Sequence, residues 1–391
     1  MAGRRGNGEG TITKLKNGLW MGRVTIGRKE DGKLNRKSLY GNTRAEVSAK
    51  MVALQNEIQT GNYIATEMTL KQWLITWLKE YKAINLKPRT YDVYETQVNY
   101  NIIPDIGNLV LKELKQQDLQ RFYNKKYNNG KGLSSATIRK IHNIINSALN
   151  QAVENDLMHK NVAKNVQLPK LVKPQVKAFT LQEQNLFFEA AKEYRLYYAF
   201  IVNVDTGLRS GELLALTWND VDLDNGLIRV NKNIMSVKNR DENAESKNKL
   251  IVQDSPKTEA SNRTIPLTKR SLSILKEIHN NKTCDIVFPS EKDTYVSLRN
   301  YQRTFYKVLD KAELKKCSPH VLRHSFVTRC FEKNVQTKVI SEMVGHAKLA
   351  HTTDIYTHIM LDVKRDAVNA LDELYSQPTV NQLNQFVNQT N

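Results

Sequence analysis

The apolar positions of the first 40 residues fall in short β-prone runs separated by turn dipeptides. These runs cover residues 11–16, 19–26 and 34–40, with Asn17-Gly18 and Asp31-Gly32 between them. Asn-Gly and Asp-Gly between such runs are typical of β-hairpins, because both dipeptides tolerate the backbone angles of tight turns. The pattern therefore predicts three short strands that pair as hairpins.

The spacing of apolar residues then changes to that of a helix. Residues 44–59 form this segment, and Thr43 before it can cap a helix N-terminus. The apolar positions lie three or four residues apart, on one helical face: Val47, Met51, Leu54 and Ile58. The first part of the chain thus predicts a three-stranded sheet backed by one helix, a unit that could lay its sheet in a DNA groove.

A helical region follows from Thr69, and strand signals are scarce in it. Its periodicity predicts helices at residues 70–84, 87–101, 118–128 and 135–155. Ser134 or Ser135 can cap the last of these helices. The region ends at residues 169–177, where two prolines and several lysines without an acidic residue predict an interdomain linker.

The segment after the linker mixes both periodicities. It predicts helices at residues 181–194 and 197–205, strands at residues 227–231 and 263–266, and further helices to about Leu374. Residues 376–391 are rich in Gln and Asn and lack charged side chains, which predicts a poorly ordered tail.

These segments together predict a multidomain α+β chain. The expected domains are a sheet-plus-helix domain at residues 1–65, an all-α domain at residues 66–172, and a mainly α domain with a small antiparallel sheet at residues 173–375. Residues 376–391 form the tail.

The charge balance points to a polyanionic partner. The chain has 59 Lys and Arg against 40 Asp and Glu, a formal charge of +19. Residues 1–65 hold 12 basic and 5 acidic side chains and residues 66–175 hold 17 and 9, so the first 175 residues carry +15 of this charge. Such an excess favours attraction to nucleic acid phosphates, although general solubility would also explain it.

Cysteine and apolar content argue for a reducing compartment. The three cysteines, Cys284, Cys317 and Cys330, form no CxxC pair, so they predict neither a disulfide framework nor a zinc site. Neither a secretory leader nor an apolar run long enough to span a bilayer is expected, and we expect a cytoplasmic protein.

Arg209 stands at a turn before an apolar helix. In the sequence Thr206-Gly207-Leu208-Arg209, followed by Ser210-Gly211-Glu212, the carboxylate of Glu212 lies one turn after the arginine. That spacing allows Glu212 to hold the Arg209 guanidinium still, and a fixed guanidinium suits the oxygens of a phosphate. On spacing alone, a surface ion pair is the favoured alternative.

Ser318-Pro319 predicts a helix start with Ser318 as cap and Pro319 as first residue. His320 and Arg323 then share one face and can point at one anion, where they would stabilise the charge of a pentacoordinate phosphorus. An ordinary helix with the same HxxR spacing is an equal alternative.

Three further side chains have less local support. Gly345 suits the left-handed position after a helix and places His346 on a turn. Tyr356 has polar neighbours, which suits an exposed hydroxyl. Lys257 precedes the β-prone run at residues 263–267, in a long hairpin connection. There it could protonate a leaving oxygen, but a lysine that contacts phosphate or is simply solvated fits the local sequence equally well.

These residues, in their order along the chain, resemble the active-site set of the tyrosine recombinase (phage integrase) family: Arg209, Lys257, His320, Arg323, His346 and Tyr356. The resembling motifs are TGLRSGELLAL, SPKTEASNRTIPL, HVLRHSF and GHAKLAHTTDIYTH, within residues 206–358. The front half resembles the arm-binding and the SAM-like core-binding domains of integrases from conjugative transposons and temperate phages.

The resemblance implies a site-specific recombinase that needs no metal, cofactor or nucleotide. Tyr356 would attack DNA and form a 3′-phosphotyrosyl link, and a 5′-hydroxyl would later reseal the strand. Arg209 and Arg323 would clamp the phosphate, Lys257 would act as general acid, and His320 and His346 would assist, with Glu212 in support. Lys247 or Lys249 could compete with Lys257 for the acid role.

The resemblance also implies partners. These are double-stranded DNA with core-type and arm-type attachment sites, and a homotetramer on that DNA, which would be associated with the bacterial nucleoid. Accessory directionality or DNA-bending proteins are further candidates. Residues 363–374 form an amphipathic segment that could pack on a neighbouring subunit or on the subunit to which it belongs.

Three rival functions remain open from the sequence. A type IB topoisomerase would use similar chemistry, but the separate basic front domain argues against it. A non-enzymatic DNA-binding regulator would explain the charge but would not require the six residues in that order. A metal-dependent transposase or nuclease would need a carboxylate cluster, and nothing marks the available candidates as ligands: Asp205, Asp220, Asp222 and Asp224.

Overall fold

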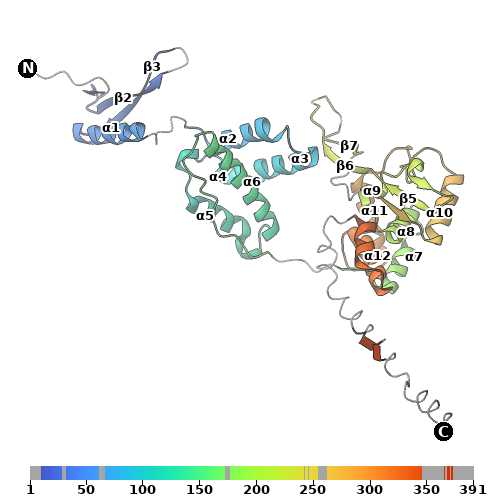
Figure 1. Cartoon of the computed structure of the whole chain (residues 1–391). Coiled ribbons are helices and arrows are strands. Elements are labelled where there is room, and N and C mark those ends of the chain that lie inside the picture. The colour runs from blue at the N-terminus through green and yellow to red at the C-terminus, as the bar shows by residue number, and fades with distance from the viewer. Residues whose placement is uncertain are drawn as a thin grey trace, which may run out of the picture. The chain divides into compact units, whose positions relative to one another are not determined.

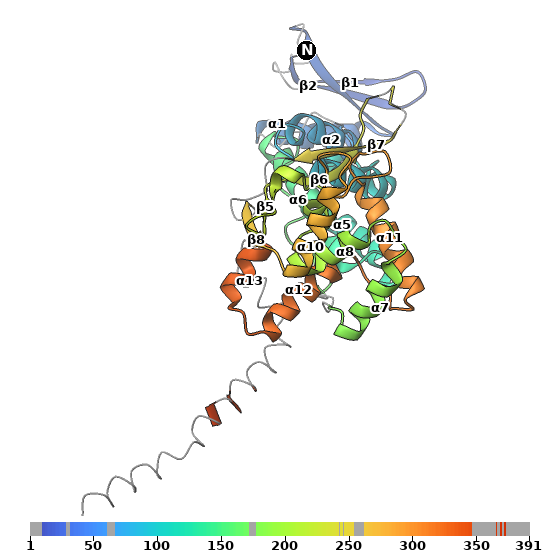
Figure 2. The same ribbon diagram turned by 90° about the vertical axis from the view of Figure 1, so that its right-hand side faces the viewer.

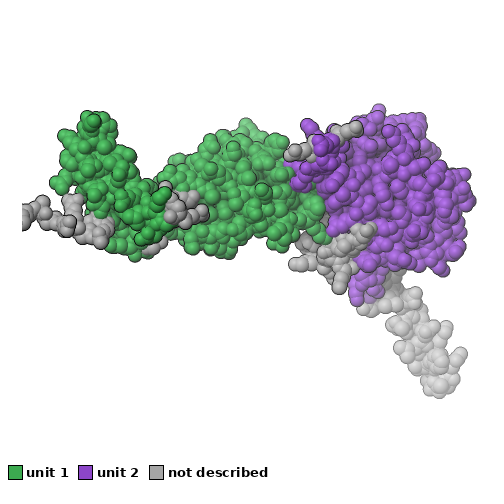
Figure 3. All heavy atoms as spheres, turned by 90° about the horizontal axis from the view of Figure 1, so that it is seen from above, with its two compact units in different colours: residues 1–172 green, residues 173–391 purple. Residues whose placement is uncertain are grey.

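The chain forms two compact units, residues 1–172 and residues 173–391 (Figure 3). The computed structural model describes residues 10–28, 32–60, 67–171, 177–241, 243–244, 246–253 and 262–345, with 365, 368–369 and 371–372. No helix among the described residues is long and apolar enough to cross a membrane.

The first unit begins with an antiparallel sheet in the order β1-β2-β3, covered on one face by helix α1 (Figure 1). The elements are β1 (Thr11–Lys14), β2 (Trp20–Arg28), β3 (Leu34–Gly41) and α1 (Arg44–Gln59). The Thr43 hydroxyl accepts a hydrogen bond from the Glu46 amide at 3.1 Å, and Val47, Met51 and Leu54 pack on Val24 of the sheet. The predicted sheet backed by one helix is confirmed.

The rest of the first unit is helical. Its elements are α2 (Leu70–Thr76), a π-helical segment (Trp77–Lys82), α3 (Pro88–Gln97), a second π-helical segment (Val98–Ile102), α4 (Ile103–Ile106), a 3-10 turn (Leu111–Glu113), α5 (Gln116–Tyr127), a second 3-10 turn (Asn128–Gly130) and α6 (Ser135–Glu154). Ser134 caps α6 by accepting from the Thr137 amide at 3.2 Å. Trp73 and Trp77 are buried in the common core, and Trp73 Nε1 donates to the Ala148 carbonyl of α6 at 2.8 Å.

The second unit combines helices with a small antiparallel sheet in the order β4-β5-β8 and a separate two-stranded sheet of β6 and β7. Its first half contains α7 (Leu181–Ala191), α8 (Tyr197–Thr206), α9 (Ser210–Leu213), a 3-10 turn (Trp218–Asp220), β4 (Val221–Asp222), β5 (Leu227–Val230), β6 (Asn233–Lys238) and β7 (Asn248–Gln253). Its second half contains β8 (Arg263–Pro266), α10 (Lys269–Asn280), α11 (Leu298–Lys311), α12 (His320–Glu332) and α13 (Thr337–Val344).

Aromatic side chains join the helices of this unit. Phe187 of α7 contacts Phe200 of α8 and Phe305 of α11, with ring centroids 5.4 and 5.2 Å apart. Helix α12 packs on α8, and α13 contacts both α12 and β8 (Figure 2). The core therefore brings the ends of α8, α12 and α13 together with the sheet.

The backbone of Phe179, near the start of this unit, is hydrogen-bonded to two side chains of α12. The Phe179 amide donates to Ser325 Oγ at 2.9 Å, and the Phe179 carbonyl accepts from Arg329 Nη2 at 2.6 Å. Both partners belong to α12, so the start of the second unit is fixed to that helix.

The predicted α+β fold class is confirmed, with local differences. Strands β4, β6 and β7 were not predicted. Helix α12 begins at His320, one residue later than predicted, with Pro319 rather than Ser318 before it. Of residues 363–374, the described ones are helical, and Val368 and Leu371 among them are exposed. The packing of that segment stays a prediction, and the tail at residues 376–391 lies outside the described residues.

Candidate active site

A tight turn after α8 places Arg209. Gly207 ends the helix with φ +63°, and a Cβ atom on it would lie 2.4 Å from Cδ1 of Phe326 in α12. Asn203 of α8 also holds the turn, since its Nδ2 donates to the Leu208 carbonyl at 2.7 Å. Asn203 is itself fixed by Tyr301, whose Oη donates to Asn203 Oδ1 at 3.0 Å. The turn requires glycine at residue 207, and it presents Arg209 at the N-terminus of α9.

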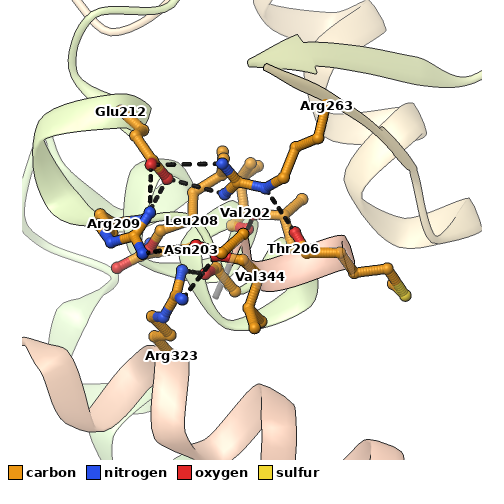
Figure 4. Close-up of polar contacts among 12 residues, drawn as sticks. Val202, Asn203, Thr206, Leu208, Arg209, Glu212, Arg263, Arg323 and Val344 are labelled. Carbon is orange, nitrogen blue, oxygen red and sulfur yellow. Dashed lines mark hydrogen bonds and ion pairs between the residues drawn. The ribbon is translucent and has the colours of Figure 1, made fainter. Parts of the chain in front are cut away.

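The carboxylate of Glu212 lies between two guanidinium groups (Figure 4). Arg209 Nη1 donates to Oε1 at 2.7 Å and the Arg209 amide donates to Oε2 at 2.9 Å. On its other side, Arg263 Nη2 donates to Oε2 at 2.8 Å and Nη1 to Oε1 at 3.3 Å. Glu212 and Arg209 thus make the contact that their spacing allows. The surface ion pair favoured by spacing alone is wrong, because the Glu212 side chain is only 7% exposed.

Two opposing effects act on the charge of Glu212. Burial raises its pKa, but the hydrogen bond and charge of Arg263 and the charge of Arg209 outweigh burial and lower the pKa to about 2. The carboxylate is therefore ionised at neutral pH, and it holds both arginines in place.

Arg323 lies deep in the fold. The residue is 2% exposed, and it donates from Nη1 to the Gly207 carbonyl at 2.9 Å and from Nη2 to the Val344 carbonyl at 2.6 Å. It thereby ties α12 to the turn that presents Arg209 and to the end of α13. The sequence predicted its place near a helix start but not its burial.

His320 lies one turn before Arg323 and is exposed to solvent. Its ring packs edge-on against His324, with centroids 4.6 Å apart. Loss of hydration, followed by the positive charges of Arg323 and Arg209, lowers the pKa of His320 to about 4. The imidazole is therefore neutral at neutral pH.

Helix α13 ends as the sequence predicts. Gly345 follows it with φ +66° and ψ +50°, in the left-handed region, and its carbonyl accepts from Arg209 Nη2 at 2.9 Å. The next residue, His346, lies outside the described residues, as do Lys257 and Tyr356. The two competing lysines are described, and both are exposed, with Lys249 in β7 opposite Val237 and Lys247 just before that strand.

Two of the four aspartates considered for a metal site, Asp205 and Asp220, have other partners. Asp205 accepts from Arg270, Thr268 and Ser271, and Asp220 accepts from Lys232 and Thr217. No group of three or more potential ligands lies together in the part of the chain that the structure describes. These contacts give the metal-dependent alternative no support.

Sequence reasoning missed Arg263, which binds Glu212 as closely as Arg209 does. A signal was present in β8, where alternation places Arg263 on the same side of the strand as the buried Ile265. A charged residue on the inward side of a strand indicates a buried partner.

Comparison with known proteins agrees with these features. The phage integrase family pattern matches residues 176–361, and the phage integrase N-terminal SAM-like domain matches residues 69–127. A tyrosine recombinase XerC-like protein of Caldanaerobacter subterraneus subsp. tengcongensis is 34% identical, over 90% of this chain and 95% of that protein. The ICEBs1 integrase of Bacillus subtilis is 23% identical, over 93% of this chain and all of that protein.

Solved structures show the same fold. The Tn1549 transposon integrase in complex with a circular intermediate DNA aligns with a TM-score of 0.65 and 21% identity, covering 78% of this chain and 99% of that one. A lambda integrase dimer bound to a core site aligns with a TM-score of 0.57 and 17% identity, covering 90% of this chain and 96% of that one.

Proposed function

This chain belongs to the phage integrase family of tyrosine-type site-specific recombinases, and on that premise we propose that its active site consists of six residues in one cluster. They are Arg209, Lys257, His320, Arg323, His346 and Tyr356. Three of them, Arg209, His320 and Arg323, lie among the described residues.

The observation that carries this proposal is how Arg209 and Arg323 converge at the end of α13. They donate to the adjacent carbonyls of Gly345 and Val344, and both charges lower the pKa of His320. Two guanidinium groups and a neutral imidazole, one from the turn before α9 and two from α12, thus share one small region. This is the charge pattern that a phosphodiester in transition to five-coordinate phosphorus requires.

The proposed reaction conserves the energy of the phosphodiester bond. The phenol oxygen of Tyr356 forms a bond to phosphorus while the bond from phosphorus to the 5′ oxygen breaks, which leaves a 3′-phosphotyrosyl link. The phenol passes its proton to a histidine of the cluster, His320 or His346, and Lys257 protonates the departing 5′ oxygen. Attack by the 5′-hydroxyl of another strand reverses these steps and reseals the DNA, so the reaction needs no nucleotide.

Each described residue has a defined task in this proposal. Arg209, whose side chain is 39% exposed and is fixed by Glu212, binds a non-bridging phosphate oxygen. His320 is neutral before DNA binds, so it can accept or donate a hydrogen bond as charge develops. Arg323 supplies positive charge from within and holds the turn of Arg209 in place.

The same proposal covers the partners. Core-type sites would bind the second unit and the helical part of the first, and arm-type sites would bind the basic residues 1–65. A tetramer on two duplexes would exchange strands to integrate or excise a mobile element in the cytoplasm, at the nucleoid. We keep the division into domains at residues 1–65, 66–172 and 173–375 as part of this proposal.

A trapping experiment tests the nucleophile. A nicked core-site oligonucleotide incubated in EDTA should give a covalent protein–DNA adduct, because the short fragment that bears the new 5′-hydroxyl diffuses away after cleavage. Tyr356→Phe should abolish the adduct while leaving DNA binding intact. An adduct that survives this substitution would reassign the nucleophile.

A truncation tests the front domain. Removal of residues 1–65 should abolish binding to arm-type DNA while cleavage of a core-site suicide substrate continues. Loss of that cleavage would contradict the division of tasks between the domains.

A further inference from the structure

Three consecutive carbonyls at the C-terminus of α13 each accept a hydrogen bond from a different arginine. Arg263 Nε donates to Met343 at 2.6 Å, Arg323 Nη2 donates to Val344 at 2.6 Å and Arg209 Nη2 donates to Gly345 at 2.9 Å. The last carbonyls of a helix lack partners within the helix and carry the negative end of its dipole. Positive side chains from β8, α12 and the turn before α9 therefore fix this helix end.

Arg263 differs from Arg209 in its exposure. Its side chain is 6% exposed, against 39% for Arg209, and it lies on the inward side of β8. A phosphate that arrives from solvent meets Arg209 rather than Arg263. The contacts of Arg263 with Glu212 and Met343 are contacts within the protein, and they join the two groups that hold Arg209 on either side.

We propose that Arg263 is a positioning residue for recombination, which fixes Glu212, and through it Arg209, relative to the C-terminus of α13. This inference rests on the proposed function, in which Arg209 binds the scissile phosphate and the chain leaving α13 leads to His346 and Tyr356. Arg263 thereby fixes the position of Arg209, which binds the phosphate, relative to the end of α13, from which the chain continues to Tyr356.

The shape of arginine suits this task. Its three nitrogens reach Glu212 Oε1, Glu212 Oε2 and the Met343 carbonyl together. A lysine would keep the charge but supply a single ammonium that cannot span these acceptors in the same plane. The Arg263→Lys variant therefore separates geometry from charge.

A purely structural ion pair makes a different prediction. It would lower the stability of the second unit, but each folded molecule would cleave DNA at the normal rate. A positioning residue changes the rate of the chemical step in molecules that are folded and bound to DNA. The decisive quantity is the single-turnover cleavage rate at saturating protein, measured beside the dissociation constant and the melting temperature.

The experiment compares Arg263→Lys with Arg270→Lys in the full chain on a core-site suicide substrate. Arg270 pairs with the Asp205 carboxylate in the same unit but makes none of the α13 contacts, so it is a matched control. For Arg263→Lys we expect a DNA dissociation constant within about twofold of the parent and a cleavage rate lowered by roughly 10- to 100-fold. Arg270→Lys should cleave at the parent rate.

A double variant tests whether Arg263 acts through Arg209. If it does, Arg209→Lys combined with Arg263→Lys should cleave no more than about twofold more slowly than Arg209→Lys alone, because the shared interaction is already lost. If Arg263→Lys fails to fold, Glu212→Gln breaks the same connection from the other side and should show the same loss of rate at unchanged binding.

Two results would overturn the inference. One is a parent-like cleavage rate in a folded Arg263→Lys or Glu212→Gln variant, and the other is a fully multiplicative loss in the double variant. Neither result bears on Tyr356, whose assignment fails only if the Tyr356→Phe variant still forms the adduct, so the two failures are distinguishable.

Discussion

Replacing Gly207 with alanine should destabilise the second unit more than the same change at Gly226. Both glycines belong to this unit and have similar left-handed backbones, with φ +63° and +67°. An alanine in that region costs roughly 1–2 kcal/mol, because its Cβ crowds the following carbonyl. Gly226→Ala thus measures the backbone strain alone.

The two positions differ in what a Cβ atom would meet. At Gly207 it would lie 2.4 Å from Phe326 Cδ1, whereas at Gly226 the nearest atom is Leu272 Cδ2 at 3.5 Å, an ordinary contact. Phe326 is buried between α12 and its neighbours, so it has little room to yield. Overpacking of this kind costs typically about 1–3 kcal/mol. The total for Gly207→Ala is then roughly 2–5 kcal/mol.

Thermal unfolding of the full chain, followed by calorimetry, measures the difference. The first unit is identical in both variants, so the transition that moves belongs to the second unit. At about 2–4 °C per kcal/mol for a unit of this size, Gly207→Ala should melt roughly 2–12 °C below Gly226→Ala. Equal melting temperatures would refute the clash with Phe326, and parent-like melting of both would refute the strain.

Three further predictions follow from charges and caps. The folded pKa of Glu212 is about 2 against an ordinary 4.5, so its stabilising effect is complete above pH 4.5 and is lost as the pH falls towards 2. In the Glu212→Gln variant, the free energy of unfolding should therefore depend less on pH in that window, as measured by circular dichroism. The pKa of His320 is about 4 against an ordinary 6.5, so the stability of the folded state falls as the pH drops from 6.5 to 4. Binding of a core-site duplex should raise this pKa, because a phosphate favours the imidazolium form. An NMR titration that shows no rise would place His320 away from the phosphate. Thr43→Ala should destabilise α1 by about 1 kcal/mol by removing the cap on the Glu46 amide, whereas Thr43→Ser should retain it, as hydrogen exchange in α1 would show.

Most elements could be predicted because their signals are local. The caps Thr43 and Ser134 and the glycine after α13 mark helix ends within a few residues of the backbone groups they satisfy. The β6 and β7 strands were missed because they are separated by a polar stretch, and their pairing depends on contacts that no local pattern encodes. The α12 boundary differs by one residue because Pro319 already has helical backbone angles without lying inside the helix.

The contacts of the site could be predicted where the two residues are close in sequence, and could not be predicted where they are far apart in sequence. The pairing of Arg209 with Glu212 spans three positions and follows from helix geometry. The burial of Arg323 depends on the carbonyls of Gly207 and Val344, and that of Arg263 depends on Glu212, 51 positions away. A side chain whose partners come from distant segments shows its role only once those segments pack together.

The attachment of Phe179 to α12 has a practical consequence for building chimeric recombinases. Both hydrogen bonds use the backbone of Phe179, and both partners lie on the helix that carries His320 and Arg323. Foreign DNA-binding modules should therefore be joined before Phe179, so that both hydrogen bonds to α12 are kept. A junction placed after Phe179 would cut the catalytic half away from its own anchor.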